Sequence, residues 1–227
     1  MKKSALFLFL SLILSPSLAL AQSVDILSQA ETYTHPFYRG GAIWSYQSRI
    51  TLIAVPQSLG NPANLNYRWS RNGTVLGSLS GVGKNTHTFS DTVLSRTQNV
   101  KVEIVSSGED VLAQNSLTLT PRAPGLHIYE NNPLYGFMFH QEVSGIYPLK
   151  ESEVTFTAFP TFFDAINLDD SSISYSWQSG DAVENKSSVT YRVPGEGSGR
   201  ASVSVSAKSS KRILETAGKG FLIQFGE

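Results

Sequence analysis

The side chains that could carry out chemistry are few in this chain, and their spacing predicts no catalytic or metal site. The four histidines show neither HxH nor HExxH spacing, the usual signs of a zinc site; they are His35, His87, His127 and His140. Cysteine is absent from all 227 residues. This excludes thiol nucleophiles, thiolate metal sites, disulfides and a lipidated cysteine.

Two short strings resemble catalytic motifs only in part. GEGSG places Ser198 between glycines, but it lies in a turn between strand-like runs, without the helix that follows a nucleophile elbow. GVGKN around Lys84 lacks the first glycine of a phosphate loop, and Asn85 stands where serine or threonine would bind magnesium. The sequence therefore predicts no cofactor and no enzymatic activity.

Acidic residues gather in one segment of the second half, where Asp164, Asp169 and Asp170 follow a strand-like run. Calcium takes about six to eight oxygen ligands, and loop carboxylates could supply some of them. No DxDxDG string is present, however, and the corresponding loop of the first half, QSLGNPANLN, has no carboxylate. We expect solvated loop charge, with these three residues as the candidate ligands if calcium binds.

The first 21 residues have the composition of a signal peptide. Two lysines precede an apolar run over residues 5–14, and Ala19 and Ala21 occupy the small-residue positions before Gln22. The run is shorter than the roughly 18 residues of a membrane-spanning helix, and no second run follows. We expect cleavage before Gln22 and an exported protein, periplasmic or at the cell surface. The lack of cysteine favours a bacterial envelope.

The charge balance argues against nucleic acid as a partner. The chain has 18 basic and 18 acidic residues, and removal of the leader lysines leaves it slightly acidic. A nucleic-acid-binding protein would show a basic excess. The hydrophobic content of 41% is sufficient for packed cores, so the chain is expected to be folded.

One pattern of about 100 residues occurs twice. SRITLIAVP at 48–56 matches SEVTFTAFP at 152–160, and LNYRWSRNG matches ISYSWQSG. HPFYRG, THTFS and VKVEIVS also have later counterparts, in NPLYG, SVTYR and ASVSVSA, and the blocks keep their order. We infer an internal duplication, with domains at 22–120 and 121–227 joined by the proline-containing segment TPRAPG.

Within each repeat, apolar and polar residues alternate with a period of two, which is typical of strands with one buried face. Examples are Ile50, Leu52 and Ala54 in the first repeat, and Val154, Phe156 and Ala158 in the second. No helical stripe of ten residues occurs after the leader. The prediction is an all-β protein of two tandem antiparallel β-sandwich domains.

The strings YRWSRNG and YSWQSG resemble the third strand of immunoglobulin-like (Ig-like) domains, in which tryptophan packs between the sheets. The resemblance implies core positions for Tyr67, Trp69, Tyr175 and Trp177. VTYRVPGEGSGRASVSVSA also resembles the PKD-type Ig-like module, whereas the first repeat has DTVLSRTQ in place of the Pro-Gly turn. The whole pattern is similar to that of uncharacterised secreted Ig-like proteins of bacteria, some linked to envelope or pilus systems, which implies a fold but no activity.

Phenylalanines outside the core pattern are concentrated in the second repeat; they are Phe137, Phe139, Phe159, Phe162 and Phe163. The first repeat has Val55 and Ser58 where Phe159 and Phe162 stand. Strand alternation places Phe159 on the outer face of its sheet. Two interpretations remain open: these rings close a sandwich end or contact the first repeat, or Phe159, Phe162 and Phe163 form a patch for a partner.

These patterns predict a non-catalytic binding or structural protein: an adhesion module, a spacer or a component of a surface assembly. The expected partner is another envelope or surface protein, bound through sheet edges. The alternative is a carbohydrate-binding accessory module of an extracellular enzyme system, which requires an exposed row of tryptophan or tyrosine. With Trp69 and Trp177 in the cores, only Trp44 is left for that role.

Overall fold

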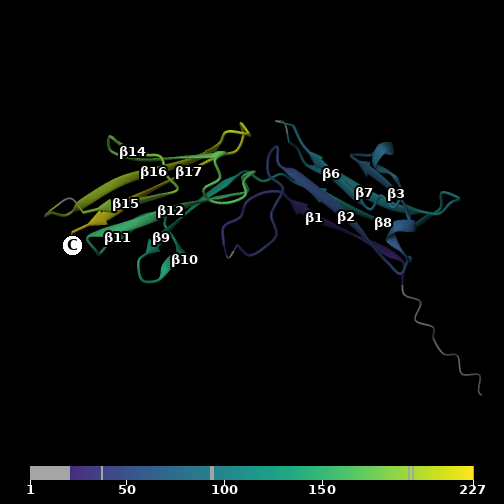
Figure 1. Cartoon of the computed structure of the whole chain (residues 1–227), viewed down its shortest axis with the longest axis horizontal. Helices are drawn as coiled ribbons and strands as arrows, with labels where there is room; N and C mark the ends of the chain where they lie inside the picture. The colour runs from purple at the N-terminus through teal and green to yellow at the C-terminus, as the bar shows by residue number, and fades with distance from the viewer. Residues whose placement is uncertain (1–20, 37, 93–94, 194, 196, 227) are drawn as a thin grey trace, which may run out of the picture.

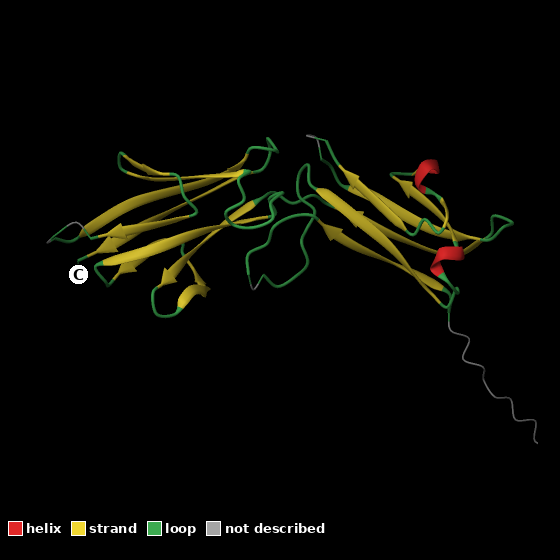
Figure 2. Ribbon diagram, viewed as in Figure 1, coloured by secondary structure: helices red, strands yellow, loops and turns green. Residues whose placement is uncertain are grey.

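The computed structural model describes residues 21–227 apart from positions 37, 93–94, 194, 196 and 227. It contains two β-sandwiches placed end to end, which we call unit one and unit two (Figures 1 and 2). The predicted signal peptide, except for its last residue, lies outside the described residues. In the part of the chain that is described, no helix is long and apolar enough to cross a membrane.

Unit one consists of two facing sheets. One sheet has the strand order β1-β2-β6 and the other the order β4-β3-β7-β8, with β5 also paired to β3, and these pairings are antiparallel. The strands are β1 (Ser23–Ala30), β2 (Arg49–Gln57), β3 (Asn66–Arg71), β4 (Thr74–Val75), β5 (Gly81–Val82), β6 (Thr86–Ser90), β7 (Gln98–Val105) and β8 (Val111–Leu119). Two short 3-10 turns, η1 (Pro62–Asn64) and η2 (Gly77–Leu79), lie in its connections.

Unit two repeats this plan with two strands added and, among the described residues, without a counterpart of β5. Its sheets have the orders β10-β9-β12-β15 and β11-β17-β16-β13-β14. The pairing of β11 with β17 is parallel, while the other pairings in these two sheets are antiparallel. The strands are β9 (Gly125–Asn132), β10 (Gly136–Glu142), β11 (Gly145–Leu149), β12 (Glu153–Thr161), β13 (Ile173–Ser179), β14 (Ala182–Glu184), β15 (Ser188–Arg192), β16 (Gly199–Ser209) and β17 (Thr216–Phe225).

Corresponding strands have the same order in both units. The sheet β1-β2-β6 corresponds to β9-β12-β15, and β4-β3-β7-β8 corresponds to β14-β13-β16-β17. Two antiparallel sheets of this order, packed face to face, form an Ig-like sandwich. The predicted all-β fold of two tandem Ig-like sandwiches is therefore confirmed.

Alternation along each strand builds a separate hydrophobic core in each unit. In β2, Ile50, Leu52 and Ala54 are buried, whereas the intervening residues are partly exposed. Burial of one such leucine or isoleucine stabilises a fold by about 1.5–3 kcal/mol. At the core centres, Trp69 is 0% and Trp177 1% exposed.

The strand β2 of unit one and its counterpart β12 of unit two are each followed by a residue in the left-handed backbone region. Ser58, just after β2, has φ 57°, and Phe162, just after β12, has φ 64°. This conformation is uncommon for residues other than glycine and costs most for a bulky side chain. Because both copies contain it, the turn belongs to the shared fold, but only unit two places an aromatic ring there.

Candidate functional site

The predicted core residues lie inside the two sandwiches. Tyr67 and Trp69 belong to the buried cluster of unit one, and Tyr175 and Trp177 to that of unit two. The third tryptophan, Trp44, is also buried, and its indole N–H donates to the carbonyl oxygen of Ser48 at 3.1 Å. None of the three tryptophans is therefore exposed as a flat platform for a sugar ring.

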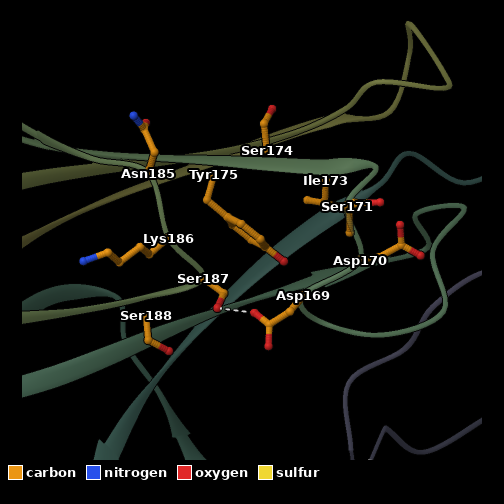
Figure 3. A pocket seen from close by; sticks show the side chains of 10 residues that line it. All are labelled: Asp169, Asp170, Ser171, Ile173, Ser174, Tyr175, Asn185, Lys186, Ser187 and Ser188. Atoms are coloured by element: carbon orange, nitrogen blue, oxygen red, sulfur yellow. Dashed lines mark hydrogen bonds between the residues drawn. The ribbon is translucent and has the colours of Figure 1, made fainter.

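The acidic segment borders an open cavity of about 690 Å³, which Figure 3 shows from close by. Within it, the Ser187 hydroxyl donates to Asp169 Oδ1 at 2.6 Å, and the Tyr175 hydroxyl donates to the backbone carbonyl of Leu168 at 2.6 Å. Burial, together with the charge of Asp169, raises the pKa of Tyr175. The phenol therefore stays protonated and holds the loop in place.

The other two candidate calcium ligands also have protein partners. Asp170 accepts hydrogen bonds from the backbone N–H groups of Ile166 and Ser172, both at 2.9 Å, and these bonds hold the pKa of its carboxyl well below the usual range. Asp164 pairs with Arg212 at 3.1 Å. Over the described residues, no group of three or more histidine, aspartate or glutamate side chains is arranged to hold a metal ion.

A long connection in unit one reaches unit two. Residues 31–48, which join β1 to β2 and which we call the strap, extend from unit one to the near end of unit two (Figure 1). The backbone N–H of Tyr33 donates to the carbonyl oxygen of Phe163 at 2.8 Å, and that of Phe162 donates to Tyr33 at 2.7 Å. Two backbone hydrogen bonds thus join the strap to the two residues that follow β12.

Aromatic rings form the second part of this contact. His35 lies against four rings of unit two at centroid distances between 5.4 and 6.4 Å; these are His127, Tyr129, Phe139 and Phe159. Tyr38 packs edge-on against Phe162 at 5.6 Å. Edge-on aromatic pairs contribute about 0.5–1.5 kcal/mol beyond the area that they bury. The aromatic contacts therefore add to the stabilisation that the two backbone hydrogen bonds give to the contact between the strap and unit two.

The three phenylalanines predicted as a partner patch occupy different places at this junction. Phe163 is fully buried in the core of unit two. Phe159 lies on the outer face of its sheet, as alternation predicts, but β10 and the strap cover it to 2% exposure. Phe162 is half-buried against Tyr38. They do not form an open patch, because the strap occupies the surface that they would offer.

The end of the strap is fixed as well. The side-chain oxygen of Gln47 accepts a hydrogen bond from the backbone of Leu214, in the turn between β16 and β17, at 3.4 Å. Ser45 forms a parallel bridge with Arg122 of the linker, whose N–H donates to the carbonyl of Trp44 at 2.9 Å. The strap is therefore held by the two residues that follow β12, by a turn of unit two and by the linker.

Two ionisable groups at the junction have pKa values shifted in the direction that favours the neutral form. Glu215 is buried next to Leu214, and burial raises the pKa of its carboxyl, although the backbone of Asp164 donates to it at 3.1 Å. Burial and the charge of Asp169 likewise raise the pKa of Tyr33. Both shifts are expected where water is excluded.

Sequence reasoning missed the strap residues of this site. It treated HPFYRG only as a block that repeats in NPLYG, and it considered His35 only as a histidine without the spacing of a zinc site. Tyr129 and Phe139, which receive His35, were not connected to it. The available signal was an aromatic loop in one repeat together with unmatched phenylalanines in the other.

No protein-family model and no curated protein sequence matches the chain. Among solved structures, it is similar to the three N-terminal domains of the bacteriophage RB49 Highly Immunogenic Outer Capsid protein (Hoc), at 17% identity and a TM-score of 0.48, over 90% of this chain and 59% of that one. The fibronectin(III)-like modules of Clostridium thermocellum CbhA are similar at 11% identity and a TM-score of 0.30, over 88% and 94% of the two chains.

The FN1–FN3 domains of chicken CNTN1 are similar at 10% identity and a TM-score of 0.29, over 83% of this chain and 65% of that one. This chain thus spans less than two thirds of the Hoc and CNTN1 chains that it matches. Its assignment as a pair of Ig-like sandwiches rests on its own strand order.

Proposed function

We propose that this chain is a non-catalytic binding or structural protein of the bacterial envelope, in which the strap makes two sandwiches act as one rigid body. The observation that carries the proposal is the double attachment of the strap to unit two. Backbone hydrogen bonds join Tyr33 to Phe162 and Phe163, and rings join Tyr38 to Phe162. Such a contact gives the two units a fixed relative orientation.

The energy needed for rigidity is small. Two sandwiches joined only by a short linker would sample several orientations. A docking free energy of about 3 kcal/mol leaves roughly 1% of molecules undocked. Two backbone hydrogen bonds at about 0.5–1.5 kcal/mol each, together with the aromatic pairs, are sufficient to supply it.

A rigid pair of sandwiches is suited to protein binding because it keeps the sheet edges of both units at a fixed distance and orientation. The edge strands β4 and β14 occupy corresponding positions, and Val75 and Val183 on them are exposed. An extended segment of a partner could add to such an edge through main-chain hydrogen bonds. The partner that we propose is another envelope or surface protein, reached after export directed by the predicted leader.

Photo-crosslinking in the cells that produce the protein tests this function. A photoreactive residue at Val75 or at Val183 should label the same partner protein, since one rigid body presents both edges. When residues 35–40 are replaced by an alternating glycine–serine segment, one of the two positions should lose that label. No protein label at either position would contradict the proposal.

The carbohydrate-binding alternative makes the opposite prediction. The full chain should remain in solution when it is mixed with insoluble cellulose, chitin or peptidoglycan, because its tryptophans are buried. Co-sedimentation with one of these polymers, without any crosslinked protein, would favour the carbohydrate-binding function instead.

A further inference from the structure

Two histidines from different units lie next to each other where the strap contacts unit two. His35, in the strap, and His127, in β9, have ring centroids 5.4 Å apart, with the ring planes tilted by 58°. The His35 residue is partly exposed, and the His127 side chain is 34% exposed. Histidine is the side chain that ordinarily gains a charge between about pH 5 and 8, so the charge at this contact can change in that range.

His127 belongs to a group of charges within unit two. Its Nδ1 atom lies 3.1 Å from Glu142 Oε1, and Glu142 also pairs with the ammonium group of Lys219. Although burial acts to raise it, the contacts with Lys219 and His127 hold the pKa of the Glu142 carboxyl below its usual range. The charges of Glu142 and Lys219 therefore cancel, and protonation of His127 gives the group one net positive charge.

Docking of the strap brings the His35 ring to this group of charges. His35 Nδ1 lies 2.7 Å from the carbonyl oxygen of Pro36, and because a carbonyl oxygen only accepts, that nitrogen carries a hydrogen. A second proton on the ring makes it a cation. The other rings in contact with His35 are uncharged; they are Tyr38, Tyr129, Phe139 and Phe159.

Among the described residues, the remaining charged groups on the strap, β9, β10 and β12 do not offset this charge. Arg39 and His140 are exposed to solvent, which screens them. The carboxylates have partners of their own: Glu31 pairs with Arg49, Glu130 accepts from the Tyr147 hydroxyl, and Glu153 pairs with Arg192. Burial, together with the charge of Glu142, raises the pKa of Tyr129, so its phenol stays neutral.

We propose that the His35–His127 pair makes docking of the strap sensitive to acid: below about pH 6, where both imidazoles are cations, the strap leaves unit two and the units become mobile. This proposal rests on the proposed function, because it regulates the contact that makes the sandwiches one rigid body. The Glu142 carboxylate does not remove the effect. Its partners His127 and Lys219 lie in unit two, so these pairs are the same whether the strap is docked or released.

The repulsion between the two cations exceeds the attraction of the surrounding rings. At 5.4 Å, repulsion disfavours the doubly charged pair by about a hundredfold at an effective dielectric constant of about 20, and by about tenfold at about 40. The second value is closer to that of partly exposed groups. Stacking of His35 on Phe139, with centroids 6.0 Å apart, favours a cation by only about two- to fivefold.

Single-molecule energy transfer between dyes on the two units measures release of the strap. Because the chain has no cysteine, Val82→Cys in unit one and Val183→Cys in unit two provide the only attachment sites, and both positions are exposed. At about pH 7.5 the chain should show one narrow distance distribution. At about pH 5.5 the fraction of undocked molecules should be roughly tenfold larger. Circular dichroism at both pH values establishes that the units stay folded.

Two variants show which histidine is responsible. His35→Phe keeps an aromatic ring at the contact but cannot become a cation, so its undocked fraction should not depend on pH. The matched control is His140→Gln, which removes an exposed histidine from β10 and should leave the response unchanged. If His35→Phe is already undocked or unfolded at about pH 7.5, His127→Phe takes its place, because it removes the second cation and should abolish most of the response.

Equal undocked fractions at the two pH values in the folded, unaltered chain would overturn the proposal. A response that persists in the His35 or His127 variant, or that is lost in His140→Gln, would overturn it too. Failure of the proposed function gives a different result, a broad distance distribution that is present already at about pH 7.5.

Discussion

His87 lies in the core of unit one, where its ring is 5.7 Å from that of Trp69 and 5.1 Å from that of Phe89. Neither imidazole nitrogen has a hydrogen-bond partner among the described residues. Burial, together with the nearby charge of Arg71, lowers the pKa of His87 to about 4. The imidazole therefore binds a proton more tightly in the unfolded chain, where its pKa is close to 6.5, than in the folded one. Protonation of His87 shifts the equilibrium toward the unfolded chain.

Unit one should lose stability as the pH falls from about 6.5 to about 4. The contribution of neutral His87 is fully present above the unfolded-state pKa and declines as the unfolded chain takes up the proton, by up to about 3 kcal/mol. Urea unfolding followed by tryptophan fluorescence at several pH values measures this. In His87→Leu the decline over this window should be smaller by that amount, and equal slopes would contradict the account.

The two core tryptophans allow packing to be separated from hydrogen bonding. The Nε1 atom of Trp69 donates to Lys84 and that of Trp177 to Lys186, at 2.9 and 2.8 Å. Trp69→Ala and Trp177→Ala should each lower the free energy of unfolding by about 3–5 kcal/mol. Replacement by phenylalanine, which keeps most of the packing, should cost less; equal losses would indicate that the indole packs loosely.

At the residue scale, the sequence allowed the cores to be predicted but not the junction. The repeated Tyr-x-Trp strings were sufficient to place Trp69 and Trp177, because a period of two determines which side chains face inward. The same rule placed Phe159 on the outer face. It could not indicate that this face is covered, since burial there depends on a loop about 120 residues away in the sequence.

At the element scale, the strap and the end of β12 should form one cooperative contact. Phe162 has a left-handed backbone conformation, and its ring packs against that of Tyr38. Phe162→Gly relieves that backbone strain but removes the ring. Trypsin cleavage after Arg39 in the strap should then become roughly two- to tenfold faster, in line with the loss of about 0.5–1.5 kcal/mol of docking energy.

Ser58→Gly is the matched control, because Ser58 has nearly the same φ in unit one and no aromatic ring. Cleavage after Arg39 should keep its unaltered rate in this variant. If both glycine variants are cleaved alike, backbone conformation rather than the ring controls the strap.

Strands were predictable as elements because each shows its alternation locally, as β2 and β12 do. The strap has no such periodicity, and its two backbone hydrogen bonds to Phe162 and Phe163, just after β12, join distant parts of the chain. The parallel pairing of β11 with β17 was likewise not predicted, because a short run such as GIYPL does not specify its partner. Long-range pairing depends on the whole fold.

At the scale of the whole molecule, export is the first expectation to test. If the leader directs secretion, the intact mass of the protein from periplasmic or culture fractions should correspond to residues 22–227. A membrane-embedded form that retains Met1 would contradict the predicted cleavage and the envelope location proposed here.

The most direct test of the central claim is the relative orientation of the two units in solution. Residual dipolar couplings from the backbone N–H groups report the alignment of each unit separately. In the unaltered chain, one alignment tensor should fit units one and two together, and replacement of residues 35–40 by glycine and serine should require two. Two different tensors in the unaltered chain would contradict the account, because they would show that the strap does not join the sandwiches into one body.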